Sequence, residues 1–341
     1  MIAFLPNCGI TIGLGHLMRC LSLAEQLRAM GEECCFFLKD KTACELASRR
    51  GFAVKQFEEK QSNSLGLRSV LKNFRVRFFV VDSYSVTGEY LELLRDCAPV
   101  VYLDDVKAFP YPCDVLVNYN IYGTDWEQSY KANQQKFGTK LLLGPQYVPL
   151  RKEFENLPAH KTEDRVRRVF VSTGGSDPQN VMHSLLTMVG SVKEWQSIEF
   201  HAVIGALNPN KKEIEQTACN MQNIKLHIEE QKIAQLMCQC DLAVSAAGST
   251  LYELCACGVP TVTYALADNQ LPGAGAFEAH ALMKMAGDCR VHKIEERIFE
   301  CLQELMENAS LRSNISHRMQ AAVDGKGAQR LAMALRSACN K

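Results

Sequence analysis

The pattern of hydrophobic and polar positions alternates between two kinds of segment along most of the chain. Short apolar runs typical of buried strands are separated by stretches whose apolar residues recur at helical spacing. In the first half, the predicted strands are residues 1–8, 34–38, 52–54, 77–82, 100–104 and 114–118, and the predicted helices are 17–30, 42–50, 64–74 and 87–96. This alternation favours a parallel, doubly wound α/β sheet, whose ligands bind beyond the carboxyl ends of the strands.

The periodicity breaks at residues 144–151, which contain two prolines, and resumes at residue 168. The second half predicts strands at 168–172, 199–204, 224–228, 242–245 and 261–265, and helices at 179–192, 251–257, 294–307, 310–322 and 327–339. A chain of 341 residues exceeds the usual size of one α/β domain. We therefore expect an N-terminal Rossmann-like domain at 1–150, a C-terminal one at 165–325, and a final helix at 326–341 that could pack back on the first domain.

Residues 241–270 read as strand, small-residue loop, helix and strand, and Gly258 ends the helix. The loop ends in Ser249 and Thr250, where the helix N-terminus would stabilise a phosphate through unpaired N–H groups and the helix dipole. Glu253, one turn in, could accept hydrogen bonds from ribose hydroxyls, although a solvated helix glutamate is the simpler alternative. The segment is typical of half a nucleotide site.

A second glycine turn, at Gly174 and Gly175, follows the strand at 168–172. Its successive N–H groups could form an anion-binding nest, or it could be an ordinary strand-to-helix turn. We expect Asp177 to cap the following helix and Pro178 to lie in its first turn.

In the first half, Gly13 and Gly15 precede His16 at the start of a predicted helix. The helix dipole disfavours an imidazolium there, so a neutral imidazole beside an anionic ligand would suit a general base near pH 7. The alternative is a histidine that caps the helix or packs against a strand.

Further polar residues leave strand ends, where side chains meet ligands in this fold class. They could instead cap loops or helices, and they are Asp82, Tyr84, Asp104, Asp105, Asn118, Asp268, Asn269 and Gln270. Arg151, after the proline-rich break, could form a salt bridge or reach a phosphate. The remaining histidines are scattered, so the sequence predicts no metal site.

Charge and cysteine content exclude several classes of protein. The 38 basic and 38 acidic residues balance, which gives no electrostatic case for a nucleic-acid or membrane partner. The 15 cysteines lack a CxxC pair, and we expect them to be reduced packing residues. Because no apolar run of about 18 residues occurs, we expect a cytoplasmic protein, and we expect a monomer.

Eight motifs together resemble the UDP-2,4-diacetamido-2,4,6-trideoxy-β-L-altropyranose hydrolases of pseudaminic acid biosynthesis. They are GxGHxxRC (13–20), VDSY (81–84), LDD (103–105), NYN (118–120), GPQYxPLRxEF (144–154), VSTGGSDPxN (171–180), SAAGSTLYEL (245–254) and ADNQ (267–270). The resemblance runs from the first residues to about Gln270. It implies a fold similar to the inverting GT-B glycosyltransferases.

The resemblance implies that the C-terminal half binds UDP, with Glu253 on the ribose. Gly174, Gly175, Ser249 and Thr250 would surround the pyrophosphate. His16 would deprotonate a water that attacks the anomeric carbon with inversion, and the backbone and helix termini would stabilise the leaving UDP without a metal or other cofactor. The other implied substrate-binding residues are Gly13, Gly15, Arg19, Asp82, Tyr84, Arg151, Asn269 and Gln270, of which Asp82, Tyr84, Asn269 and Gln270 would contact the sugar or hold His16.

Three alternatives stay open at this point. A GT-B glycosyltransferase would pass the sugar from UDP to a lipid or protein acceptor. A related hydrolase would act on a different UDP-diacetamido sugar. A binding protein would take up a UDP-sugar without turnover, against which the intact His16 argues.

Overall fold

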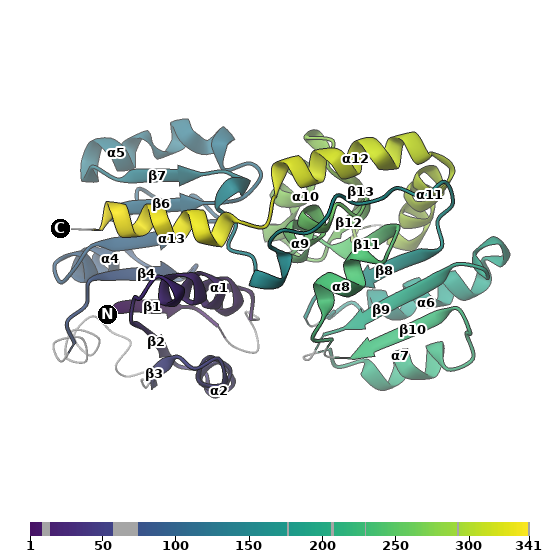
Figure 1. Cartoon of the computed structure of the whole chain (residues 1–341), viewed down its shortest axis with the longest axis horizontal. Coiled ribbons are helices and arrows are strands. Elements are labelled where there is room, and N and C mark those ends of the chain that lie inside the picture. The colour runs from purple at the N-terminus through teal and green to yellow at the C-terminus, as the bar shows by residue number, and fades with distance from the viewer. Residues whose placement is uncertain are drawn as a thin grey trace. The chain divides into compact units, whose positions relative to one another are not determined.

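The computed structural model describes residues 1–8, 14–56, 74–175, 177–205, 208–228, 230–291 and 293–339. The chain divides into two compact units (Figure 1). The N-terminal unit comprises residues 1–152 and 326–341, and the C-terminal unit comprises residues 153–325.

The N-terminal unit is built on a parallel sheet of seven strands in the order β3-β2-β1-β4-β5-β6-β7. Its strands are β1 (Ile2–Pro6), β2 (Cys34–Leu38), β3 (Ala53–Gln56), β4 (Phe78–Asp82), β5 (Val100–Leu103), β6 (Val115–Asn118) and β7 (Lys140–Leu143). Its helices are α1 (Gly15–Ala29), α2 (Lys41–Arg49), α4 (Gly88–Arg95), α5 (Lys131–Phe137) and α13 (Gly327–Ala338), with 3₁₀ turns η2 (Thr124–Tyr130), η3 (Pro145–Tyr147) and, at the boundary with the C-terminal unit, η4 (Lys152–Phe154). The strand order reverses between β1 and β4, which is where ligands bind in doubly wound sheets.

The C-terminal unit repeats this plan with six strands in the order β10-β9-β8-β11-β12-β13. Its strands are β8 (Arg168–Ser172), β9 (Glu199–Ile204), β10 (Ile224–Ile228), β11 (Leu242–Ala246), β12 (Thr261–Ala265) and β13 (Lys284–Asp288). Its helices are α6 (Val181–Ser191), α7 (Lys211–Ala218), α8 (Ile233–Cys238), α9 (Thr250–Cys257), α10 (Leu271–Ala279), α11 (Ile294–Glu307) and α12 (Ala309–Ala322), with 3₁₀ turns η5 (Lys193–Trp195) and η6 (Asp268–Gln270). Here the order reverses between β8 and β11.

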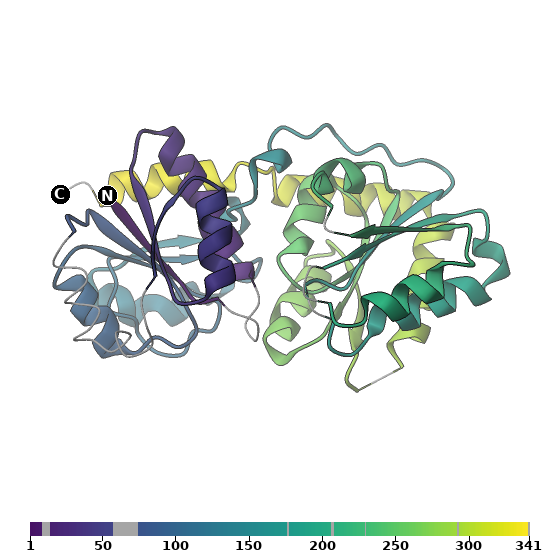
Figure 2. The same ribbon diagram turned by 90° about the horizontal axis from the view of Figure 1, so that it is seen from below.

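Apolar side chains fill both faces of each sheet. All residues of β1, β4, β11 and β12 are buried, as expected for central parallel strands that helices cover on either side (Figure 2). The two parallel sheets confirm the predicted doubly wound α/β class. No helix within the described ranges is long and apolar enough to cross a membrane.

The final helix, α13, belongs to the N-terminal unit. It packs against α1 and η3 and buries Leu331 and Leu335. Arg336 Nε donates to Glu32 Oε1 at 2.8 Å, and the same carboxylate receives Arg77 Nη1 at 2.6 Å. A Cβ on Gly327 would lie 2.2 Å from the Val148 carbonyl oxygen, so the helix starts where only glycine fits.

The turn before α6 differs in one respect from the prediction. The Asp177 carboxylate does cap the helix, because it accepts the N–H groups of Val181 and Met182 at 2.9 Å. Pro178, however, is not in the first helical turn. Asn180 has a left-handed φ of 53°, so the chain turns once more and the helix begins only at Val181.

Candidate functional site

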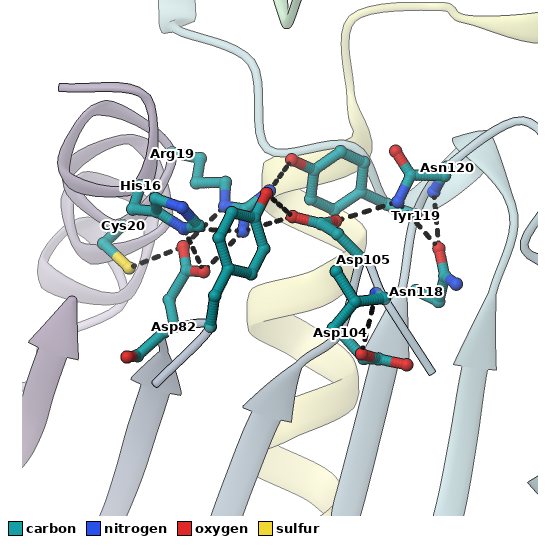
Figure 3. Close-up of polar contacts among 12 residues, drawn as sticks. His16, Arg19, Cys20, Asp82, Asp104, Asp105, Asn118, Tyr119 and Asn120 are labelled. Carbon is teal, nitrogen blue, oxygen red and sulfur yellow. Dashed lines mark hydrogen bonds and ion pairs between the residues drawn. The ribbon is translucent and has the colours of Figure 1, made fainter. Parts of the chain in front are cut away.

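Polar side chains gather at the carboxyl edge of the N-terminal sheet, beside the reversal of strand order (Figure 3). They come from α1 and from the segments that leave β4, β5 and β6. His16 and Arg19 are three residues apart in α1 and therefore share one face of that helix. Asp82 ends β4, Asp105 follows β5, and Tyr119 and Asn120 follow β6.

His16 and Asp82 form a buried pair. The imidazole Nδ1 lies 2.6 Å from Asp82 Oδ1, with the histidine 6% exposed and the aspartate 0% exposed. Burial by itself would raise the pKa of Asp82, but the Arg19 guanidinium and His16 hold it at about 2. Asp82 is therefore ionised, and its contact with Nδ1 orients the imidazole.

Arg19 lies between two carboxylates. It contacts both oxygens of Asp82, and Nη2 donates to Asp105 Oδ2 at 2.8 Å. Its guanidinium also donates to the Tyr119 hydroxyl and stacks 5.2 Å from that ring. Burial opposes the charge, yet Asp105 and Asp82 raise the pKa of Arg19 well above its usual value. The side chain is thus a fixed buried cation.

Tyr84 and Cys20 complete the surroundings of the pair. The Tyr84 ring meets the His16 ring edge-on with centroids 4.6 Å apart, and its hydroxyl donates to Asp105 Oδ2 at 3.0 Å. Tyr84 is 42% exposed, so its ring borders the open side of the cluster. The Cys20 thiol donates to Asp82 Oδ2 at 3.7 Å, and burial and that carboxylate raise the pKa of the thiol.

The side chains of Asp104 and Asn118 bind backbone groups of the loops that follow their strands. The buried Asp104 carboxylate accepts hydroxyls from Tyr111 and Tyr130 and backbone N–H groups of the loop that follows. Asn118 Oδ1 accepts the N–H of Asn120 at 3.0 Å. The capping alternative therefore describes these two residues, and their loops place Asp105 and Asn120 in the cluster.

The C-terminal unit presents its glycine turn and the start of α9 at the corresponding edge of its sheet, beside the reversal between β8 and β11. Gly174 has a left-handed φ of 78°, and its N–H donates to Ser172 Oγ at 3.3 Å. A Cβ on Gly174, Gly175 or Gly248 would meet nothing within 4 Å among the described residues. A ligand can therefore approach this backbone closely.

The remaining candidates in this unit lie around the same edge. Ser249 precedes α9, Thr250 begins it and Glu253 is its fourth residue, half-buried. Asn269 is exposed. Gln270 Oε1 accepts the N–H of Leu266 at 2.8 Å, and Asp268 pairs with Arg290 at 2.7 Å. Gln270 thus caps its own loop, as the alternative interpretation held.

The other predicted residues of this unit make none of the contacts described above. Gly13 is outside the described residues, Gly15 is the first residue of α1 and directly precedes His16, and Arg151 is half-buried after β7 and η3. No group of three or more metal-ligating side chains occurs in the part of the chain that the structure describes. All fifteen cysteines are free thiols.

Asp105, Tyr119 and Asn120 belong to the cluster, but the sequence singled out only Asp105, as one of the strand-end candidates with a capping alternative. Their signal in the sequence was the pair of acids after one buried strand and the Asn-Tyr-Asn run after the next. The sequence of these two segments does not indicate which polar residue faces the site. The conformation of each loop decides it, because the loops direct Asp104 and Asn118 toward backbone groups.

Comparison with known proteins shows similarity at the level of family and fold. Residues 168–329 match the family model for the glycosyltransferase family 28 C-terminal domain. The chain is 25% identical over 286 residues to an uncharacterized protein of Methanocaldococcus jannaschii, covering 79% of this chain but 56% of that relative. It is 24% identical to the spore coat polysaccharide biosynthesis protein SpsG of Bacillus subtilis, covering 96% and 95%. It is 25% identical to the UDP-2,4-diacetamido-2,4,6-trideoxy-beta-L-altropyranose hydrolase of Campylobacter jejuni, covering 74% and 86%.

Among solved structures, MurG of Acinetobacter baumannii aligns with a TM-score of 0.72 at 12% identity, covering 98% of this chain and 99% of that one. The glycotransferase of kitacinnamycin aligns with a TM-score of 0.67 at 14% identity, covering 99% and 98%. At this identity the likeness shows the fold alone. It confirms the predicted GT-B type, with two Rossmann-like domains.

Proposed function

We propose that this protein hydrolyses UDP-2,4-diacetamido-2,4,6-trideoxy-β-L-altropyranose to UDP and the free sugar. The observation that carries the proposal is the buried His16–Asp82 pair at the ligand-binding edge of the N-terminal sheet. A carboxylate on Nδ1 gives the imidazole the arrangement of a general base. The similarity to the Campylobacter jejuni hydrolase supports the choice of substrate and of water as acceptor.

In the proposed mechanism, His16 Nε2 takes a proton from a water as that water attacks the anomeric carbon. The bond between this carbon and the diphosphate oxygen breaks, and UDP leaves with the electron pair, so the configuration inverts. Asp82 stabilises the imidazolium that forms, and Arg19 keeps Asp82 ionised. Tyr84, at the open side of the pair, would contact the acylated sugar or restrict the imidazole.

The C-terminal unit would hold UDP. The open glycine turn and the start of α9 offer N–H groups and a helix dipole to the diphosphate, with Ser249 and Thr250 beside it. Glu253 would accept hydrogen bonds from the ribose hydroxyls. Because backbone dipoles can stabilise the leaving diphosphate, we propose that the reaction needs no metal.

The test is UDP release by the purified protein in EDTA without an acceptor. The L-altro substrate is compared with UDP-N-acetylglucosamine and with the diacetamido gluco analogue. Release from the L-altro compound alone is the expected result. Release only from another sugar would replace the proposed substrate, and the absence of release from all three, both in EDTA and with a divalent cation, would reject the hydrolase.

A glycosyltransferase is the second candidate, because residues 168–329 match a glycosyltransferase domain. It predicts slow UDP release that accelerates strongly when an acceptor alcohol is added. A metal requirement would appear as release that EDTA abolishes and a divalent cation restores.

A further inference from the structure

One nitrogen of Arg19 has more acceptors than hydrogens. Its Nη2 contacts Asp82 Oδ1, lies 2.8 Å from Asp105 Oδ2 and lies 2.9 Å from His16 Nδ1 (Figure 3). A guanidinium Nη carries two hydrogens, so at most two of these three contacts can be full hydrogen bonds. Hydrogen bonds to ionised oxygens are about twice as strong as those to neutral acceptors. The two carboxylates therefore take both hydrogens.

The allocation of these hydrogens fixes the proton on His16. With none left for Nδ1, this nitrogen is not an acceptor for Arg19. It lies 2.6 Å from Asp82 Oδ1, so it carries the proton itself and donates to the carboxylate. Nε2 then keeps the lone pair that a general base requires.

Hydrogen bonds hold the Asp105 carboxylate in place beside Arg19. Its Oδ1 accepts Asn120 Nδ2 at 2.8 Å, and its Oδ2 accepts the Tyr84 hydroxyl at 3.0 Å as well as Arg19. Its side chain is 13% exposed. The carboxylate touches Arg19 rather than the imidazole, so any effect on His16 passes through the guanidinium.

We propose that Asp105 is a positioning residue that sets the tautomer of His16 by occupying one hydrogen of Arg19 Nη2. Without this carboxylate, Nη2 has a spare hydrogen 2.9 Å from His16 Nδ1. Arg19 then competes with the Nδ1–H bond to Asp82 by donating to Nδ1, which raises the population of the tautomer protonated at Nε2. In that tautomer the ring has no lone pair for a water. The catalytic consequence rests on the proposed function, but the tautomer itself does not.

The experiment is ¹⁵N NMR of the histidine side chains without substrate, at about pH 8.5, where an ordinary imidazole is neutral. The His16 signals are assigned from a His16→Gln spectrum. We expect the wild type to show Nδ1 protonated and Nε2 unprotonated. Asp105→Ala should shift the population toward the Nε2-protonated form, and Asp105→Asn, which keeps a neutral acceptor in the same volume, should shift it less.

Asn120→Ala is the matched control. It removes the donor to Asp105 Oδ1 and leaves Oδ2 with Arg19, so its His16 tautomer should stay that of the wild type. Circular dichroism and the melting temperature establish which variants are folded. A folded Asp105 variant with the wild-type tautomer would overturn the proposal, as would a wild type already protonated at Nε2.

Kinetics supply a second readout. If His16 is the base, Asp105→Ala lowers kcat by about 10² while KM changes little, and Asp105→Glu restores part of kcat. A tautomer shift in a protein that releases no UDP would reject the proposed function and keep the role of Asp105. An unchanged tautomer in an active hydrolase would reject the role of Asp105 and keep the proposed function.

Discussion

Asp82 brings the His16 imidazole and the permanently charged Arg19 guanidinium together in a buried position. Its two oxygens are hydrogen-bonded to His16, Arg19 and Cys20, and the residue is fully buried. A buried carboxylate is costly unless it is paired and hydrogen-bonded, and three donors from α1 meet that requirement. The first two turns of α1 are thus positioned by the same contacts that orient the imidazole.

His16→Gln should lower UDP release by a factor of about 10² or more, because general-base catalysis contributes about that much. UDP binding, measured by calorimetry, should stay near the wild-type value, since the proposed nucleotide site is in the other unit. His317→Gln, an exposed histidine of α12, is the control and should keep full activity. Full turnover by His16→Gln would remove the residue from the mechanism.

Glu253→Ala should weaken UDP binding about tenfold or more, because hydrogen bonds to a charged acceptor contribute about 1.5–3 kcal/mol each. Glu296→Ala removes an exposed glutamate from the first turn of α11 in the same unit and serves as the control. The dissociation constant of UDP is the measurement. Equal constants for the two variants would place Glu253 away from the ribose.

At the scale of elements, strands were the most predictable part of the chain. The strands at 34–38, 168–172, 199–204, 224–228 and 261–265 have the predicted bounds, because apolar runs between turns have few other solutions. The edge strands β7 and β13 were missed. β7 is four residues long and its apolar run at 141–143 ends directly at the proline-containing break, whereas β13 is largely half-exposed and contains a lysine and a glycine. Most of the predicted helix at 64–74 lies outside the described residues.

The polar cluster was partly predictable for a related reason. The sequence indicated that Asp82 and Tyr84 leave a strand end and that His16 begins the helix after a glycine loop, and the doubly wound topology brings such positions together. It could not indicate that Asp104 would turn into its own loop while Asp105 turned toward Arg19. That choice depends on hydroxyls from Tyr111 and Tyr130, which are distant in sequence.

The attachment of α13 depends on Glu32, which joins Arg336 of that helix to Arg77. Glu32→Gln should destabilise the N-terminal unit by about 1 kcal/mol, the usual size of a partly buried ion pair. Glu33→Gln, the exposed neighbour, is the matched control. Urea unfolding followed at Trp126 is the measurement, in a Trp195→Phe background that leaves a single tryptophan. Identical midpoints for both variants would contradict this role.

At the scale of the whole molecule, each unit carries its own tryptophan, Trp126 or Trp195, so their stabilities can be followed separately. The folded N-terminal unit holds the pKa of Asp82 at about 2, despite the opposing effect of burial, whereas an unfolded aspartate titrates near 3.9. A lowered folded-state pKa gives stability that is complete above the unfolded value and is lost as pH falls toward the folded value.

Acidification from about pH 5 to about pH 2 should therefore remove on the order of 2 kcal/mol of stability from the N-terminal unit through Asp82. The measurement is the urea midpoint at Trp126 in the Trp195→Phe background, with and without Asp82→Asn. The difference between the two proteins should shrink as pH falls. A difference independent of pH would show that Asp82 is not an ionised partner in the folded state.

The central claim is that water attacks the anomeric carbon of a UDP-sugar and not its phosphorus. Turnover of the L-altro substrate in H₂¹⁸O, followed by mass spectrometry of both products, tests it most directly. We expect no ¹⁸O in UDP, and ¹⁸O at the anomeric position of sugar analysed before its hydroxyl exchanges with solvent. Label in UDP would mean attack at phosphorus and would contradict the proposed mechanism.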